Sequence, residues 1–141
     1  MAKFDIFMIK ENYLNKSVIN EHVCLRGIKF EETDETVVIP STFNGQPITH
    51  FGYEQYFDPA HEDWHDWHHP TAYGCDWVPD KYGMCYANTI VVPDHVKKVI
   101  IPASIKDIQR EILKAKPGVL EFDGESDNYV INGGKIDYRR D

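Results

Sequence analysis

The sequence predicts a mostly β domain of the α+β class, with short strands, short helices and a helical, aromatic- and histidine-rich insertion. Three observations support this prediction. Short β-branched runs end at a proline, as Thr36–Ile39 does at Pro40. Asn44-Gly45 is a strong tight-turn pair, because both residues tolerate positive φ. All three tryptophans fall within residues 53–89, between two regions of short apolar runs.

The size and charge of the chain limit its organisation and partners. Its 141 residues indicate a single domain, and a hydrophobic content of 42% is sufficient for a packed core. The formal charge of −8, without a dense Lys/Arg block, argues against a nucleic-acid partner. No segment reaches membrane-spanning length, and no signal-peptide pattern is seen. We therefore expect no membrane association and a cytoplasmic location, or a surface or secreted one if a signal precedes these residues.

The first 35 residues are expected to form N-terminal strands that act as a cap. Phe4–Ile9 and His22–Phe30 each have strand composition, and Asn12–Ser17 reads as a turn or short helix between them. The carboxylates that follow are more simply read as a solvated turn than as a calcium site. They are Glu31, Glu32, Asp34 and Glu35.

Residues 90–141 return to short apolar runs. Val99–Ile101 ends at Pro102, which cannot donate to a sheet ladder, and Ile90–Val92 ends at a proline in the same way. Isoleucines then recur at helical or turn-like spacing up to Pro117-Gly118. Two further strand candidates follow, Val119–Phe122 and Tyr129–Ile131.

Three stretches resemble the BspA-type leucine-rich repeat proteins of bacteria. They are VVIPSTFNGQPITHFG, KKVIIPASIKDIQREILKAK at 97–116 and VLEFDGESDNYVINGGKIDY at 119–138. The resemblance implies a leucine-rich-repeat-like short β-solenoid, with 36–52 repeat-like, 53–89 an insertion and 90–141 repeat-like with a C-terminal cap. It also implies a bacterial source and an adhesive or host-interacting role. Gln109 stands where the repeat expects a glycine, whereas Gly52 retains it.

The insertion contains HEDWH, which fits the zinc-peptidase pattern H-E-x-x-H with His61, Glu62 and His65. A helix from Asp58 to about His69 would place three histidines on one face, where they could bind zinc or nickel without catalysis. They are His61, His65 and His68.

Several features argue against a peptidase. The helix is acidic and surface-like, and the longer metzincin pattern fails at His68 and Thr71. An amphipathic capping helix with half-buried Trp and His is the simplest reading. Cys75 and Cys85 are alternative metal donors, and they either form one disulfide or, more simply, stay reduced.

The aromatic residues of the insertion are candidates for partner binding, because Tyr and Trp are enriched at interface hot spots. The alternative is that they form the insertion's own small core, and the two roles are compatible. The candidates are Trp64, Trp67, Tyr73 and Trp77.

The function expected from the sequence is non-catalytic recognition of a protein or ligand, through a repeat face, the aromatic insertion or both. The alternative is a zinc-dependent hydrolase or a metal-stapled structural domain that uses the HEDWH segment. A short stack leaves open ends that need caps or a second subunit, so we also expect self-association.

Overall fold

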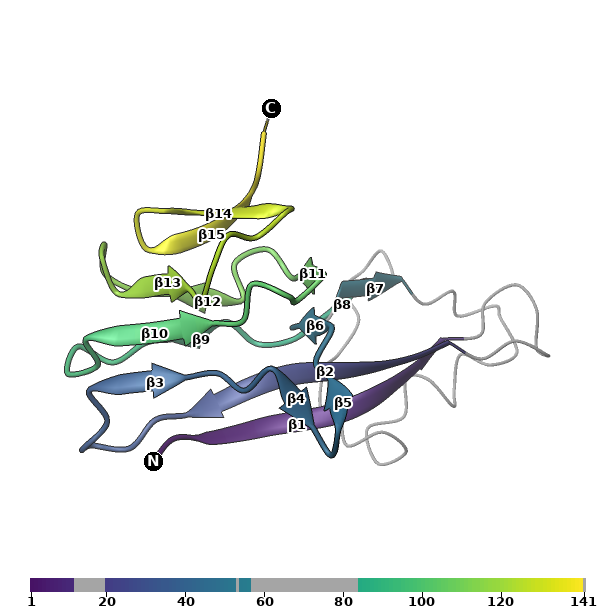
Figure 1. The fold of residues 1–141 in the computed structure, drawn as a ribbon, viewed down its shortest axis with the longest axis horizontal. Coiled ribbons are helices and arrows are strands. Elements are labelled where there is room, and N and C mark those ends of the chain that lie inside the picture. Colours follow the sequence, from purple (N-terminus) through teal and green to yellow (C-terminus); the bar gives the residue numbers. More distant parts are fainter. Residues whose placement is uncertain (12–19, 53, 57–83, 141) are drawn as a thin grey trace.

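The computed structural model describes residues 1–11, 20–52, 54–56 and 84–140, in which the chain forms strands and no helix (Figure 1). Among these residues, no helix has the length and apolar character needed to cross a membrane. The strands are β1 Lys3–Glu11, β2 Asn20–Lys29, β3 Thr36–Val38, β4 Thr42–Phe43, β5 Gln46–Pro47, β6 His50–Phe51, β7 Glu54–Tyr56, β8 Met84–Tyr86, β9 Ile90–Val91, β10 Lys98–Ile101, β11 Asp107–Ile108, β12 Leu113–Lys114, β13 Leu120–Phe122, β14 Tyr129–Asn132 and β15 Lys135–Tyr138.

The proline-terminated runs lie side by side in a parallel sheet of order β13-β10-β3 (Figure 1). Val99 in β10 is in register with Val37 in β3 and with Leu120 in β13. All three side chains are buried, while the next residue on each strand faces outward. The runs before Pro40 and Pro102 thus pair directly with each other in one sheet.

A second row of parallel pairs lies in the sheet of order β1-β2-β6-β11. Phe51 in β6 is in register with Leu25 in β2 and Ile108 in β11, and all three are buried. β9 and β12 form a third set, a single parallel pair in which Ile90 lies opposite Leu113. The inward side chains of all three sets belong to one hydrophobic core.

Antiparallel hairpins lie at the two ends of the stack that these parallel strands form (Figure 1). β1–β2 lies at one end, and β14–β15 lies at the other, beyond β13. Tyr129 and Ile136 of the second hairpin are buried in the core. The Tyr129 hydroxyl accepts a hydrogen bond of 2.8 Å from the backbone N–H of Ile108, on the side of β11 away from β6. The Tyr129 side chain therefore provides an acceptor for a backbone N–H at this edge of the sheet.

The predicted tight turn is confirmed. Asn44 and Gly45 have φ values of 51° and 80°, and they connect β4 to β5 in a two-residue hairpin. Positive φ at both central positions is the geometry of a type I′ turn. Residues 41–47 are all exposed, so this hairpin projects from the body of the domain.

The predicted α+β class, a leucine-rich-repeat-like short β-solenoid with short helices and a helical insertion, is wrong. The described residues contain strands and no helix, and their strands form several small sheets of two to four strands. The isoleucines after Pro102 follow turns instead. Ile105 N–H donates to Pro102 O at 3.3 Å and Ile112 N–H to Gln109 O at 3.2 Å, and each turn places one isoleucine in the core. Single turns and one face of a helix give the same spacing, so the spacing did not distinguish them.

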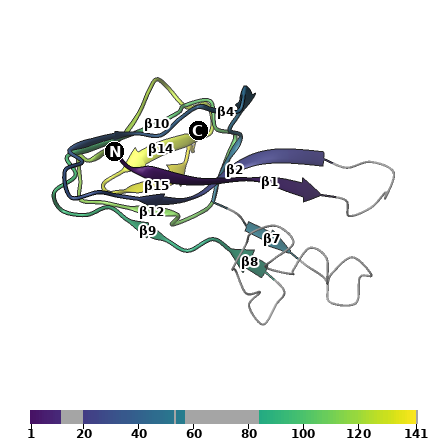
Figure 2. The ribbon, with the colours of Figure 1, turned by 90° about the horizontal axis from the view of Figure 1, so that it is seen from below.

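The 53–89 insertion begins and ends in a strand pair. β7 and β8 are antiparallel, with Glu54 opposite Tyr86, and they lie to one side of the parallel strands in both views (Figure 2). The predicted helix from Asp58 to His69 lies outside the described residues. The structure therefore defines the base of the insertion.

Replacing Tyr129 with Phe tests the hydroxyl at the edge of β11. The change leaves the buried Ile108 N–H without its acceptor, which costs about 1–3 kcal/mol of unfolding free energy. Tyr138→Phe is the comparison variant: Tyr138 contacts Tyr129, with ring centroids 5.3 Å apart, but its loss of a hydroxyl leaves the Ile108–Tyr129 bond in place and should therefore cost less than Tyr129→Phe. Urea denaturation of the two variants measures the difference, and equal midpoints would contradict the role assigned to Tyr129.

Candidate functional site

The residues predicted to bind metal or a partner lie outside the described part of the chain. They are His61, His65, His68, Trp64, Trp67, Tyr73 and Trp77. Cys75 lies there too, and Cys85 belongs to β8 without a described side chain. In the described residues, no group of three His, Cys, Asp or Glu side chains is arranged to hold a metal ion. The metal and aromatic assignments therefore stay predictions.

The chain enters the insertion at Gly52, a position that accepts only glycine. Its φ is +77°, in the left-handed region, and a Cβ there would lie 2.7 Å from Gln109 Cβ and 2.8 Å from Ile112 Cγ1. Both obstacles come from the turn that follows β11, because Gln109 follows Ile108, the register partner of Phe51, and Ile112 N–H donates to Gln109 O. Cys24 Sγ also donates a hydrogen bond of 3.0 Å to Gly52 O. The start of the insertion is thus fixed by close packing.

The chain leaves the insertion at Ala87, which is held by the side chain of Gln109. Gln109 Oε1 accepts from Ala87 N at 2.9 Å, and Gln109 Nε2 donates to Ala87 O at 2.8 Å. The side-chain amide thus pairs with the backbone of Ala87 as a neighbouring strand would. Gln109 is buried, so both bonds are sheltered from water. Gln109, which directly follows β11, therefore contacts both ends of the insertion.

Two histidines and an aspartate lie beside the start of the insertion. The rings of His22 and His50 are 4.5 Å apart between centroids. His50 Nε2 lies 3.3 Å from Asp107 Oδ2, and its Nδ1 lies 2.8 Å from Thr49 Oγ1. No sequence motif indicates this cluster, because its residues come from three separate strands, β2, β6 and β11.

Burial lowers the pKa of His50 from its ordinary value of 6.5, and the neighbouring His22 lowers it further. The Asp107 carboxylate opposes this shift. Only 17% of the His50 side chain is exposed, so it loses much of the hydration that a charged imidazole requires. The folded protein therefore favours neutral His50.

The outward face of the β13-β10-β3 sheet carries an aliphatic pair. Val38 is 62% exposed and lies opposite the partly exposed Ile100. Lys98 and Glu121 flank the pair, with 3.5 Å between Lys98 Nζ and Glu121 Oε2. This face therefore carries a small apolar pair beside an ion pair.

A polar cleft of about 840 Å³ lies between the end of the insertion and the β14–β15 hairpin. Charges of both signs line it, and Lys135 Nζ lies 3.6 Å from Glu111 Oε1. Its lining residues are Ala87, Thr89, Gln109, Arg110, Glu111, Asn132, Lys135, Ile136 and Asp137. The mixture of charges favours no single class of ligand.

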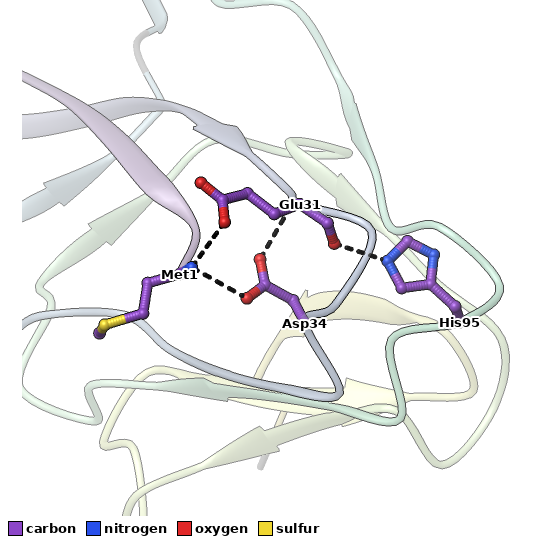
Figure 3. Close-up of polar contacts among 4 residues, drawn as sticks. All are labelled: Met1, Glu31, Asp34 and His95. Atoms are coloured by element: carbon purple, nitrogen blue, oxygen red, sulfur yellow. Dashed lines mark hydrogen bonds and ion pairs between the residues drawn. The ribbon is translucent and has the colours of Figure 1, made fainter.

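The acidic turn at residues 31–35 is less solvated than predicted (Figure 3). Asp34 is 9% exposed, and its Oδ2 accepts a hydrogen bond of 2.8 Å from Glu31 N. The amino group of Met1 lies 2.7 Å from Glu31 Oε2, and His95 Nε2 lies 2.8 Å from Glu31 O. Asp34 therefore closes its own turn, a common use of Asp side chains.

Comparison of the chain with protein-family models, curated proteins and solved structures finds no match. The resemblance to BspA-type repeats thus stays a prediction that rests on the three quoted stretches.

Replacing Gln109 with Met tests the pairing with Ala87. The variant keeps the length and apolar stem of the side chain but loses both hydrogen bonds, which costs about 2–4 kcal/mol of unfolding free energy. Hydrogen exchange should also accelerate at Ala87, more than at Val99 in the core. Gln109→Glu keeps the acceptor for Ala87 N but places a buried carboxylate oxygen against Ala87 O, so it should be at least as destabilising as Gln109→Met at neutral pH. Unchanged exchange at Ala87 in Gln109→Met would refute the assignment.

Acidification should destabilise the protein through His50. Because the folded-state pKa is lowered, the unfolded chain binds more protons below pH 6.5. The free energy of unfolding should therefore decline as pH falls from about 6.5 through the lower folded pKa. His50→Asn should reduce this decline, whereas His95→Asn should leave it in place. Chemical denaturation between pH 8 and pH 4 measures it, and identical slopes for His50→Asn and the parent protein would contradict the prediction.

Proposed function

We propose that this protein is a non-catalytic recognition module that binds a protein partner through the outward face of the β13-β10-β3 sheet, with the aromatic insertion as a second contact. The observation that carries the proposal is the exposed pair Val38 and Ile100 on adjacent strands. Val37 directly precedes Val38 and Val99 directly precedes Ile100, and both valines point into the core. The outward residues are therefore free to differ in chemistry without altering the packing.

The geometry of the sheet suits recognition. Parallel pairing on both sides of β10 holds Val38, Ile100 and Glu121 in one row across three strands. A row fixed by backbone hydrogen bonds loses little conformational entropy on binding, which favours affinity. The Lys98–Glu121 pair at the margin adds electrostatic selectivity more than affinity.

The base of the insertion supports its role as a second contact. Gly52 and Ala87 are both held against Gln109, so the insertion leaves the domain from a fixed position. Trp64, Trp67, Tyr73 and Trp77 are its proposed contact residues. The metal-staple alternative, with His61, His65 and His68 as ligands of zinc, can be tested by metal analysis of the purified protein.

A charge placed on the exposed valine tests the sheet face. Val38→Asp should abolish capture of the partner from native cells and weaken the measured Kd at least about tenfold, because a carboxylate would have to be desolvated in the interface. Val91→Asp is the matched control, since Val91 is 68% exposed on β9, in a different sheet. Isothermal titration with the captured partner measures both.

Equal affinity for Val38→Asp and Val91→Asp would refute the sheet-face proposal. Trp64→Ala and Trp67→Ala, measured with the same partner, then decide the contribution of the insertion. Retained binding by both tryptophan variants would remove the insertion as a contact.

A further inference from the structure

Among the described strands, the sheet of order β1-β2-β6-β11 ends in the nine-residue strand β1, which pairs there with β2 alone. β1 has the sequence KFDIFMIKE, with four consecutive apolar residues at its centre and charges near its ends. Its C-terminal half extends beyond the parallel strands in both views (Figures 1 and 2). A long apolar edge strand is a template for pairing with another chain.

The hydrogen-bond pattern shows which backbone groups of β1 face away from β2. The carbonyls of Val23 and Leu25 accept bonds from Thr49 N and Gly52 N, so these two residues face β6. The backbone N–H and C=O groups of Cys24 must then point toward β1, and those of its register partner Phe7 point toward β2. Ile6 and Met8, on either side of Phe7, therefore point their N–H and C=O groups outward. Within the described part of the chain, no hydrogen bond reaches these outward groups.

We propose that two copies of this chain pair antiparallel through β1, across a twofold axis at Phe7, and join their four-stranded sheets into one. In this register Ile6 faces Met8 of the second copy, and the two residues exchange the hydrogen bonds that each lacks alone. Phe7 lies opposite Phe7 of the second copy in a non-hydrogen-bonded pair, where side chains approach most closely.

Charge selects this register over its neighbours. An axis at Phe7 places the Lys3 position opposite the Glu11 position at both ends of the paired strands. An axis at Met8 would instead place Asp5 opposite Glu11, which is repulsive. An axis at Ile6 leaves Lys3 opposite an isoleucine and Glu11 beyond the end of the strand. The axis at Phe7 also pairs all nine residues, about 30 Å of strand.

Charge reversal tests both the dimer and its register. Analytical ultracentrifugation of the full chain should show a concentration-dependent monomer–dimer equilibrium. Lys3→Glu should weaken dimerisation about tenfold or more, because two like-charged pairs replace two opposite ones, and Lys3→Glu with Glu11→Lys should restore it. A chain that stays monomeric at millimolar concentration overturns the proposal, as does a dimer that Lys3→Glu does not weaken.

Backbone and cysteine variants test the geometry independently. Met8→Pro removes an outward N–H and no bond to β2, so it should give a folded monomer, whereas Met8→Ala should remain dimeric. Phe7→Cys should form an intermolecular disulfide, because the paired Cα atoms lie about 4.5 Å apart at a non-hydrogen-bonded pair. Lys3→Cys, whose two copies would be about 26 Å apart, should form none beyond the level of the parent chain.

A dimer in which Phe7→Cys crosslinks no more than Lys3→Cys overturns the register. If Met8→Pro fails to fold, as circular dichroism would show, the charge-reversal series decides the outcome. Binding of another protein through Val38 does not enter any of these measurements, so the two proposals fail separately.

Discussion

The packing of buried side chains between in-register parallel strands is the constraint on which the other features depend. Leu25, Phe51 and Ile108 stack across three strands, and this register brings the residue after Phe51 beside the residue after Ile108. Gly52 and Gln109 therefore meet, and only a glycine leaves space for the glutamine. The same register sets Asp107 beside His50. A slip of one residue would exchange the core and outward faces of all three strands, so one register fixes both the core and the base of the insertion.

The sequence predicted features that depend on local chemistry. The Asn44-Gly45 turn follows from the φ preferences of two adjacent residues, and the strands before Pro40 and Pro102 follow from β-branched composition and a missing N–H. The short helices expected among the described residues were wrongly predicted, because the isoleucines after Pro102, whose spacing fitted either a helix or turns, lie at the corners of successive turns. That error concerns hydrogen bonds over three residues, which spacing alone does not reveal.

The features that were missed depend on contacts between distant strands. The sequence marked Gln109 as a departure from the repeat, but its amide pairs with Ala87 only because the chain returns there after the insertion. His22, His50 and Asp107 come from three strand regions, and no motif joins them. Asp34 was read as part of a solvated charge run, yet its carboxylate closes a turn and is nearly buried. The roles of Gln109 and of the histidine cluster depend on tertiary packing, whereas the Asp34 turn is a local contact over three residues that the charge run concealed.

The two edges of the β1-β2-β6-β11 sheet are treated differently, and the difference has a physical consequence. At β11 the Tyr129 hydroxyl accepts the outward hydrogen bond of Ile108, and the β14–β15 hairpin that carries it is held in the core by Ile136. At β1 the outward groups of Ile6 and Met8 make no such bond within the described residues. The outward backbone groups of β1 must bond to water or to another strand, while its apolar side chains are stabilised by leaving water. A partner strand that covers these side chains and pairs with these backbone groups is therefore favoured. An identical β1 strand meets both conditions, and the opposite charges at its two ends favour the antiparallel arrangement.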